Sequence, residues 1–468
     1  KLAGCNYFYF HRCKPYLGTF WWKGSDSTKV LCYANDTYNG SISDELKKDL
    51  KIYSPDRGRI LQVTGVGDHG GGPTRANIEM VHQLNTKKDF PAIKFTTVSD
   101  FFKRASGEMQ NRPVHRGEMQ FIFEGCYSNV SDIKEGNRKC ENLLYEAEFL
   151  NSLGWLHGAK YPASQLRDVW ETVVFNEFHD ILPGSAINES NKESIARYFD
   201  AAQKATNLRD QAFRQMADKV KFQKGQGQPV VAFNLQPKSR KALVEASVYS
   251  HQMPATTKLQ NWGNFYGADH VETLPDSGSK TPSVLVRDAS GKEYPAQVVW
   301  GKSTPPGYTS KVQFVVDQMP AGGYQVFYVD TDKPGKYTDE IPFNDNTFES
   351  GFFTVKFNMK SGEIVSLYDK RSGKEWVKKG EGLNRLKIYL EDRKGAMKSW
   401  TINKIVGEEF VTNVKSVKLV ESGPVRACIE TVKTWGKSSF IERTYLYRSY
   451  PRIDYRLEVH WLETGTDT

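Results

Sequence analysis

The stretch that decides the architecture of this chain runs from Val169 to Ser185 and reads VWETVVFNEFHDILPGS. In and just before it, apolar residues recur at helical spacing: Leu166, Val169, Trp170, Val173, Val174 and Phe178. This spacing predicts a buried helix of about three to four turns. Ser164 is the expected N-cap, and the helix should stop at Pro183-Gly184.

Polar and titratable side chains fall on the last turn of this predicted helix. His179 and Asp180 are neighbours in sequence, and Asn176 lies on the same side. On spacing alone, a single histidine in such a place is explained by an ordinary hydrogen-bonded core or surface role. The alternative is that it binds a metal ion, which spacing alone does not favour. The choice depends on the rest of the chain.

The composition is that of a protein with several domains. At 468 residues the chain is long enough for about two to four domains with an ample core. Aromatic residues make up 13% of it, which suits contact surfaces for planar or sugar-like ligands, although a large β-rich core would use them too. The net charge of +9 is spread thinly and no Lys/Arg run resembles a nucleic-acid arm, so we expect no nucleic-acid partner.

Cysteine and hydropathy patterns exclude further classes. The six cysteines include no Cys-x-x-Cys pair, so neither a zinc knuckle nor a dense disulfide framework is indicated. No apolar run approaches the ~18 residues that a membrane span needs. The chain opens at Lys1 in strand-like sequence, as if in the middle of a domain, so the missing leader says nothing about secretion. A secreted, periplasmic or lumenal location stays open.

Residues 1–125 alternate short apolar stretches with polar helical ones. We expect strands at Cys5–Phe10, Lys29–Ala34, Ile60–Thr64 and Ala92–Thr97, and helices at Ser41–Leu50 and Arg75–Asn85. Helix after strand is typical of an α/β layer with a parallel sheet. Ligands of such sheets bind beyond the carboxyl ends of the strands, so the loops after strands are where a site is expected.

The first unusual loop, Thr19–Ser27, carries two tryptophans that lead into a Gly-Ser-Asp turn. One interpretation is a packed strand end followed by a turn that Asp26 caps. The functional interpretation is a wall on which a sugar stacks, with a polar hook beside it. Sequence alone favours the structural interpretation.

The second unusual loop, Gly65–Thr74, is rich in glycine and lies between a predicted strand and a predicted helix. Backbone amides in such a loop can cradle a phosphate, but the loop lacks the Lys-Ser/Thr of a Walker motif and the glycine spacing of the dinucleotide fingerprint. Glycines also let the backbone approach a ligand while one carboxylate, Asp68, enters a cleft. A carboxyl whose pKa is raised there can act as a general acid.

The periodicity becomes helical after the first region. Residues 126–224 should form three antiparallel helices, the first opening at the capping-box pair Asp132 and Glu135 and the third spanning about residues 188–220. The apolar stripes are Ile133, Cys140, Leu143, Leu144, Ala147 and Leu150 in the first helix, and Ile195, Tyr198, Phe199, Ala202, Ala205, Leu208, Phe213, Met216 and Val220 in the third.

Strands and turns then fill residues 229–468. Short apolar stretches such as Val312–Val316, Gln325–Val329 and Ile364–Tyr368 recur between turn signals. This pattern predicts an antiparallel β-sandwich. The expected fold is therefore multidomain, with an α/β domain, a three-helix bundle and a β-sandwich.

Five stretches together resemble one family, the class II α-mannosidases of glycoside hydrolase family 38. They are Phe20–Asp26 (FWWKGSD), Gly67–Thr74 (GDHGGGPT), Gly125–Ser128 (GCYS), Asn176–Ser185 (NEFHDILPGS), and Ser366–Lys370 with Gly373–Glu375 (SLYDK and GKE). Their order and spacing match that family over nearly the whole chain. The stretch from Asn176 to Ser185 is the most specific of them. For residues 1–125, the resemblance implies part of an α/β barrel-like catalytic domain.

The resemblance implies a retaining glycosidase that uses a divalent metal, usually zinc, to cleave α-mannosidic bonds in oligosaccharides or glycans. Such chemistry needs two carboxyl groups about 5–5.5 Å apart, a nucleophile and an acid/base, while the metal grips mannose hydroxyls and favours ring distortion. By this resemblance His179 is a metal ligand, Asp180 accepts a substrate hydroxyl, and Asp68 is the acid/base. Trp22 and Asp26 line the site.

The sequence departs from the family in one important respect. The family's His-x-Asp metal motif and its nucleophile aspartate precede the region where this sequence begins, and neither is present. We therefore expect an internal fragment that alone hydrolyses nothing, since one ligand cannot hold the metal and the nucleophile is missing. Smaller departures are Ser27, where the family commonly has Gly, and Phe123-Glu124, where it commonly has His-Arg.

A second hypothesis comes from another functional class. The chain can be a non-catalytic carbohydrate-binding or scaffold protein on the same fold. A related chain that had lost its site should also have lost Asp68 and His179, and both are present here. An oligomer is compatible with either hypothesis.

Overall fold

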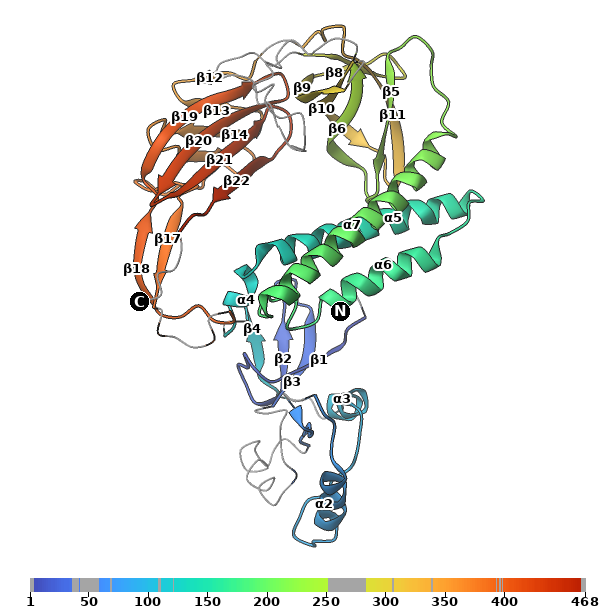
Figure 1. Ribbon diagram of the computed structural model, residues 1–468, viewed down its shortest axis with the longest axis vertical. Helices are drawn as coiled ribbons and strands as arrows, with labels where there is room; N and C mark the ends of the chain where they lie inside the picture. The colour runs from blue at the N-terminus through green and yellow to red at the C-terminus, as the bar shows by residue number, and fades with distance from the viewer. Residues whose placement is uncertain are drawn as a thin grey trace. The chain divides into compact units, whose positions relative to one another are not determined.

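The computed structural model describes residues 4–35, 42, 59–67, 70–107, 111–120, 122–250, 283–304, 307–337, 340–392, 394, 397 and 399–463. The chain divides into two compact units. The first consists of residues 1–131, 183–185 and 395–402, and the second of residues 132–182, 186–394 and 403–468. Figure 1 labels the helices and strands of both.

A four-stranded sheet is the centre of the first unit (Figure 1). Its strands, in the spatial order β1-β3-β2-β4, are β1 Tyr7–Phe10, β3 Lys29–Ala34, β2 Gly18–Lys23 and β4 Val114–Arg116. β1 runs parallel to β3, and β4 runs parallel to β2, but β2 and β3 are antiparallel. The prediction of a parallel sheet is wrong here, because the tight turn between Gly24 and Thr28 leaves no room for a crossover helix.

The two faces of this sheet bury different side chains. One face packs on helix α3 (Val98–Ser106), where the rings of Tyr7 and Phe102 stack with their centroids 4.7 Å apart. The opposite face buries Phe20, Cys32 and Ala34 together with Cys13 and Met119. Side chains that alternate along each strand therefore supply two hydrophobic layers.

Two predicted strands of the first unit are wrong, because residues 60–64 and 92–97 form no strand. Side chains satisfy their backbone instead of a neighbouring strand. The Leu61 N–H donates to Tyr33 Oη at 2.9 Å. At the second segment, Asn85 accepts the Ile93 N–H at 2.8 Å and donates to its carbonyl at 3.0 Å.

Other predictions for this unit have different outcomes. Strand β3 and helix α2 have the predicted bounds, Lys29–Ala34 and Arg75–Asn85. Helix α2 begins at a capping box in which Thr74 and Asn77 bond each other's backbone amides. The predicted helix at residues 41–50 lies outside the described residues, except for position 42.

The helical part of the chain contains α4 Gly125–Ser128, α5 Ser131–Leu156, α6 Ala163–Asn176 and α7 Asn188–Ala217. Hydrogen bonds join each pair of the three long helices: Trp170 Nε1 to Glu148 Oε1 (2.9 Å), Tyr198 Oη to Asn137 Oδ1 (2.9 Å) and Asn176 Nδ2 to Ser194 O (3.1 Å). The stripe predicted for the first helix is buried in full. Periodicity is a sufficient guide here because α5 buries one face from Ile133 to Gly154.

The central helix differs from the prediction at both ends. It begins after Pro162, so Ser164 lies inside it and is not the N-cap. It ends at Asn176, seven residues before Pro183. After Asn176 the four-residue bonding pattern of the helix gives way to a tighter one, since the Phe178 N–H donates to the Phe175 carbonyl, three residues back, at 3.2 Å.

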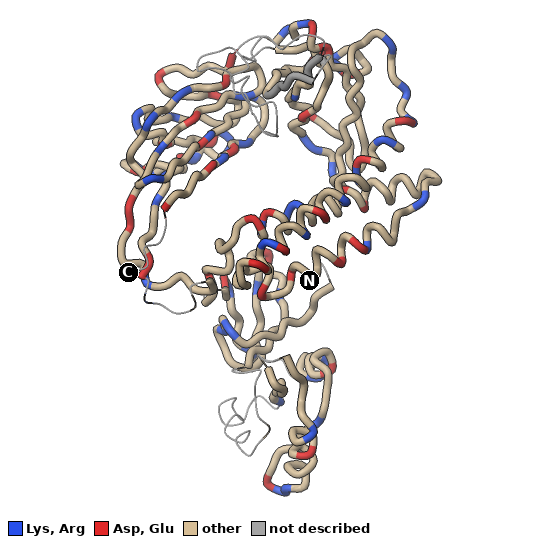
Figure 2. Tube along the Cα trace, in the orientation of Figure 1, with Lys and Arg blue, Asp and Glu red and all other residues tan. Residues whose placement is uncertain are grey.

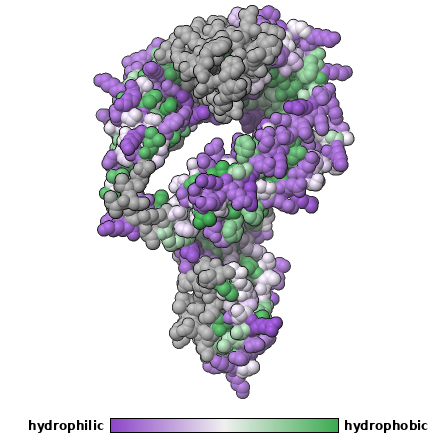
Figure 3. Space-filling view, in the orientation of Figure 1, coloured by the Kyte–Doolittle hydropathy of each residue, from purple (hydrophilic) through white to green (hydrophobic). Residues whose placement is uncertain are grey.

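The apolar stripes of α6 and α7 are narrower than predicted. Val174 and Phe178 are exposed, and so is Phe199 of α7. Helical spacing shows that apolar residues share a side but not how wide a face its neighbours cover. Figure 3 shows hydrophobic side chains reaching an otherwise polar surface in the helical region.

The described residues from 228 onward that belong to the second unit are mainly strands, and all the strand pairs found among them are antiparallel, as predicted (Figure 1). The earlier strands are β5 Gln228–Asn234, β6 Arg240–Ser250, β7 Leu285–Asp288, β8 Glu293–Tyr294, β9 Ala296–Thr304, β10 Gly307–Met319 and β11 Gly323–Asp330. The later strands are β12 Phe343–Asn344, β13 Thr347–Glu349, β14 Phe353–Phe357, β15 Ile364–Asp369, β16 Lys374–Glu375, β17 Lys387–Glu391, β18 Ile405–Phe410, β19 Asn413–Ser422, β20 Arg426–Trp435, β21 Ser438–Tyr447 and β22 Ile453–His460.

These strands form five sheets that share hydrophobic cores. The sheets β6-β10-β9 and β5-β11-β7-β8 enclose one core, in which the rings of Phe314 and Phe327 lie 4.8 Å apart. The sheets β12-β13-β14-β15-β16 and β19-β20-β21-β22 enclose a second core. A third cluster, which includes Val315 and Tyr445, joins β10 to β20 and β21. The fifth sheet is the pair β17-β18.

Among the residues that the structure describes, basic and acidic side chains are interspersed along the helices and strands (Figure 2). All six cysteines are free, and none forms a disulfide. Within the residues that the structure describes, no helix combines the length and apolarity that a bilayer crossing requires.

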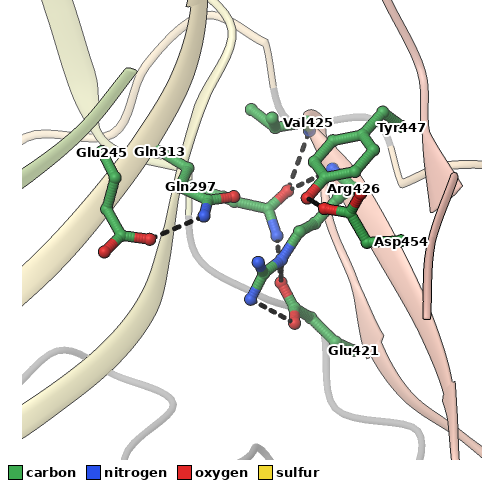
Figure 4. A network of polar contacts seen from close by, with 8 residues as sticks. All are labelled: Glu245, Gln297, Gln313, Glu421, Val425, Arg426, Tyr447 and Asp454. Carbon is green, nitrogen blue, oxygen red and sulfur yellow. Dashed lines mark hydrogen bonds and ion pairs between the residues drawn. The ribbon is translucent and has the colours of Figure 1, made fainter. Parts of the chain in front are cut away.

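A buried polar network links the two pairs of sheets (Figure 4). Gln297 of β9 donates to Glu421 Oε1 at 2.6 Å and accepts the N–H groups of Val425 and Arg426 at 2.8 and 2.9 Å. The Arg426 guanidinium makes two bonds to the Glu421 carboxylate, at 2.8 and 3.0 Å. Glu421 is only 1% exposed, so loss of Arg426 would leave a buried carboxylate without the cation that it pairs with.

We expect Arg426→Met to lower the free energy of unfolding by about 3–5 kcal/mol, because Glu421 would stay buried and charged. Urea unfolding of the purified chain measures this. The control is Lys356→Met, whose partner Asp345 is exposed and whose loss should change stability little. Equal stability of the two variants would contradict the assignment.

Candidate functional site

The strongest candidate site lies on the turn that follows α6, residues 177–183. His179 and Asp180 lie on this turn. The prediction that they lie on the last turn of a helix is wrong, because α6 ends at Asn176. The His179 Nε2 and Asp180 Oδ2 atoms are 3.5 Å apart, and the two side chains are 79% and 53% exposed. An imidazole and a carboxylate thus lie close together and exposed on one turn.

Backbone hydrogen bonds and one glycine shape the 177–183 turn. The N–H groups of Ile181 and Leu182 both donate to the Phe178 carbonyl, at 2.9 and 3.0 Å. The chain leaves the turn through Gly184, which has a φ of +72°. A Cβ there would lie 2.7 Å from the Asn129 carbonyl oxygen, so only glycine fits. The Pro183-Gly184 signal therefore marks the end of the turn.

Trp22 lies on β2, on the sheet face that also carries Phe8. Its indole N–H donates to the Gly117 carbonyl at 3.0 Å, and the Phe8 and Trp22 rings have centroids 6.1 Å apart. Phe8 is exposed and Trp22 is half-buried. Phe8 is not among the residues predicted for the site, although its place in the alternating run Tyr7–Phe10 indicates a second ring on this face.

Asp26 occupies the turn between β2 and β3. Its carboxylate accepts the Thr28 N–H at 2.9 Å and the Thr28 hydroxyl at 2.8 Å. These bonds, the backbone one first, hold the pKa of Asp26 below its usual value. Asp26 therefore caps the turn, as the structural interpretation predicted. Contact between Asp26 and a sugar stays a prediction.

The proposed acid/base, Asp68, lies outside the described residues, as does His69. The glycine-rich loop is described on both sides of them. The Val66 N–H donates to Gly71 O and the Gly70 N–H to Gly67 O, each at 2.9 Å. Because these amides bond within the loop, they do not point outward as a phosphate cradle would require.

The donors on the 177–183 turn suit zinc in part. Zinc takes imidazole nitrogen and carboxylate oxygen, and its sites usually have about four ligands. Among the residues that the structure describes, no three side chains of His, Cys, Asp or Glu come together to hold a metal ion. His179 and Asp180 are a fitting but incomplete donor set, and further ligands would have to come from elsewhere.

Three family models match this chain in order. The "Glycosyl hydrolases family 38 N-terminal domain" matches residues 1–121, the "Alpha mannosidase middle domain" residues 122–216, and the "Glycosyl hydrolases family 38 C-terminal domain" residues 348–468. The candidate turn lies inside the second match. Since the N-terminal model matches from residue 1, the expectation that the chain starts inside that domain is not confirmed and stays a prediction.

Individual relatives have related names. The chain is 31% identical to "Alpha-mannosidase 2C1" of Homo sapiens over 192 residues, which are 39% of this chain and 18% of that protein. It is 24% identical to "Alpha-mannosidase G" of Dictyostelium discoideum over 473 residues, covering 95% of this chain and 41% of that protein. This chain therefore spans well under half of the length of each of these relatives.

A solved structure shares the fold. The crystal structure of an alpha-mannosidase from Enterococcus faecalis V583 superposes with a TM-score of 0.67, at 18% identity, over 96% of this chain and 57% of that one. Both the mixed α/β architecture and the order of helical and antiparallel β parts agree with this likeness.

The pKa of Asp26 offers a test of the β2–β3 turn. Thr28→Val removes the hydroxyl donor and keeps the backbone donor, so the pKa of Asp26 should rise but stay below its usual value. Carboxyl ¹³C NMR titration measures the change. An Asp26 pKa that is the same in both proteins would contradict the described turn.

Proposed function

The chain carries domains of the glycoside hydrolase family 38 α-mannosidases, and from this we propose that it belongs to a retaining, zinc-dependent glycosidase that cleaves α-mannosidic bonds in oligosaccharides or glycans. The observation that carries the proposal is the exposed pair His179 and Asp180 on the turn after α6. This pair lies within the segment that resembles the α-mannosidase middle domain.

The roles of the site residues are part of the proposal. His179 would hold the metal through its imidazole, and Asp180, beside it, would accept a hydrogen bond from a mannose hydroxyl. Zinc, when bound, supplies Lewis-acid stabilisation and orientation of those hydroxyls. The Trp22 ring would form part of the sugar-binding wall, and Asp26 would line the site.

The acid/base and nucleophile complete the chemistry. We propose Asp68 as the acid/base, because a glycine-rich loop brings its backbone close to a ligand. Retention requires a second carboxylate about 5–5.5 Å away. We assign no residue of this chain as that nucleophile. We also propose domains at residues 1–125, 126–224 and 229–468.

In the complete gene product, His179→Ala should abolish zinc binding and lower kcat/KM for an aryl α-mannoside by more than about 100-fold. The reason is that substitution of a residue that only hydrogen-bonds to a metal ligand already costs about 10–100-fold in metal affinity or activity. Metal content and steady-state kinetics measure the two effects. The matched control is His157→Ala, because His157 is also exposed and lies beyond the last residue of α5.

Unchanged metal content and turnover after loss of His179 would refute its assignment as a ligand. Sugar binding that survives the substitution, in a protein without turnover, would instead favour the non-catalytic carbohydrate-binding alternative. Loss of both properties in the His157 variant as well would point to unfolding and would remove the support for a specific role of His179.

A further inference from the structure

Asparagine side chains hold the chain just beyond the 177–183 turn. Asn129 Nδ2 donates to the Gly184 carbonyl at 2.7 Å. Asn191 Nδ2 donates to the Ala186 carbonyl at 3.2 Å. Both bonds run from a side-chain amide to a backbone carbonyl, so they fix the path of the chain after the turn.

Asn176 holds the chain just before the same turn. It is the last residue of α6 and is 0% exposed. Its Nδ2 donates to the Ser194 carbonyl of α7 at 3.1 Å. That carbonyl lies in the interior of a helix, where it already accepts the usual bond from the amide four residues later. The extra bond therefore serves to tie α6 to α7 and is not needed to satisfy α7.

The side chain of Asn176 also carries an uncompensated polar atom. Within the described residues, Asn176 Oδ1 is buried and has no hydrogen-bond partner, and the same is true of Asn191 Oδ1. A buried unsatisfied carbonyl costs about 1–3 kcal/mol relative to an apolar group of the same shape. Stability alone therefore gives little reason for an asparagine at the end of α6, since the unsatisfied oxygen offsets the one bond that the side chain makes.

His179 and Asp180 lie three and four residues after this buried amide and are exposed. An exposed turn is mobile unless its ends are fixed, and mobile ligands lose affinity because ordering them opposes binding. Fixed ends restrict the turn to one backbone path. The imidazole is then presented in one place without being buried itself.

We propose that Asn176 is a positioning residue that holds the His179–Asp180 turn for metal and substrate. This proposal rests on the proposed function for the identity of the ligand. The fixing of the turn by Asn176 does not depend on that function. The proposal assigns Asn176 no contact with the substrate. Its hydrogen bond to Ser194 fixes the end of α6, and the turn takes its direction from that end.

The experiment compares Asn176→Ala and Asn176→Leu with the control Asn151→Ala. Asn151 of α5 also donates from Nδ2 to a carbonyl of α7, Leu208 O at 3.3 Å, beside a second bond to Ala147 O of its own helix at 2.8 Å, and it lies away from the turn. Zinc affinity of the complete gene product is measured by competition with a chelating dye. Amide hydrogen exchange of Ile181 and Leu182 is measured in the same variants.

Both Asn176 variants should bind zinc about 10–100-fold more weakly than the parent protein, and the amides of Ile181 and Leu182 should exchange faster. The Asn151→Ala variant should lose as much stability as Asn176→Ala but keep the parent zinc affinity and the parent exchange rates of Ile181 and Leu182. Asn176→Leu should stay folded, since it removes an unsatisfied buried oxygen. Reduced affinity in a variant of undiminished stability is a result that a merely structural role would not give.

Parent-like zinc affinity and exchange in both Asn176 variants would overturn the proposal. A parent protein that binds no zinc would instead overturn the proposed function. In that event the exchange rates decide alone: faster exchange at Ile181 and Leu182 in the Asn176 variants supports the positioning role, and unchanged exchange refutes it.

Discussion

The candidate site depends on one packing constraint, the burial of the Asn176 amide where α6 meets α7. The helix ends at this residue, and the chain then enters the turn that carries an exposed imidazole and carboxylate. The exposed His179 and Asp180, which a ligand would meet, thus lie only three and four residues after the buried Asn176. Burial of the helix end supplies the rigidity that the exposed side chains cannot supply for themselves.

The fold could be predicted from sequence where one physical signal dominated. The buried residues of α5 were predicted correctly because a long helix that is covered on one face buries its apolar residues only by placing them at helical spacing on that face. The predictions of strand β3 and of antiparallel strands in the later part of the chain are correct because short apolar runs between turn signals are typical of strands. Residues 60–64 and 92–97 have the same apolar character but bond to the side chains of Tyr33 and Asn85, which no local pattern reveals.

The site was less predictable than the fold. His179 and Asp180 are neighbours in sequence and lie close in space. Helical spacing predicted a helix that continues past Asn176 and carries both residues, which is wrong because α6 ends at Asn176. Periodicity did not show that Val174 and Phe178 are exposed, because the width of a buried face depends on neighbouring helices. The carboxylate of Asp26 is engaged by Thr28, so a residue that the family resemblance assigns to the site also has a local structural role.

The proposal that this chain belongs to a zinc-dependent α-mannosidase is tested by hydrolysis of an aryl α-mannoside by the complete gene product. Turnover is measured with the protein as purified, after treatment with a chelator, and after zinc is restored. We expect turnover that the chelator abolishes and zinc recovers. A folded complete gene product that shows no turnover with any divalent metal would contradict the proposal.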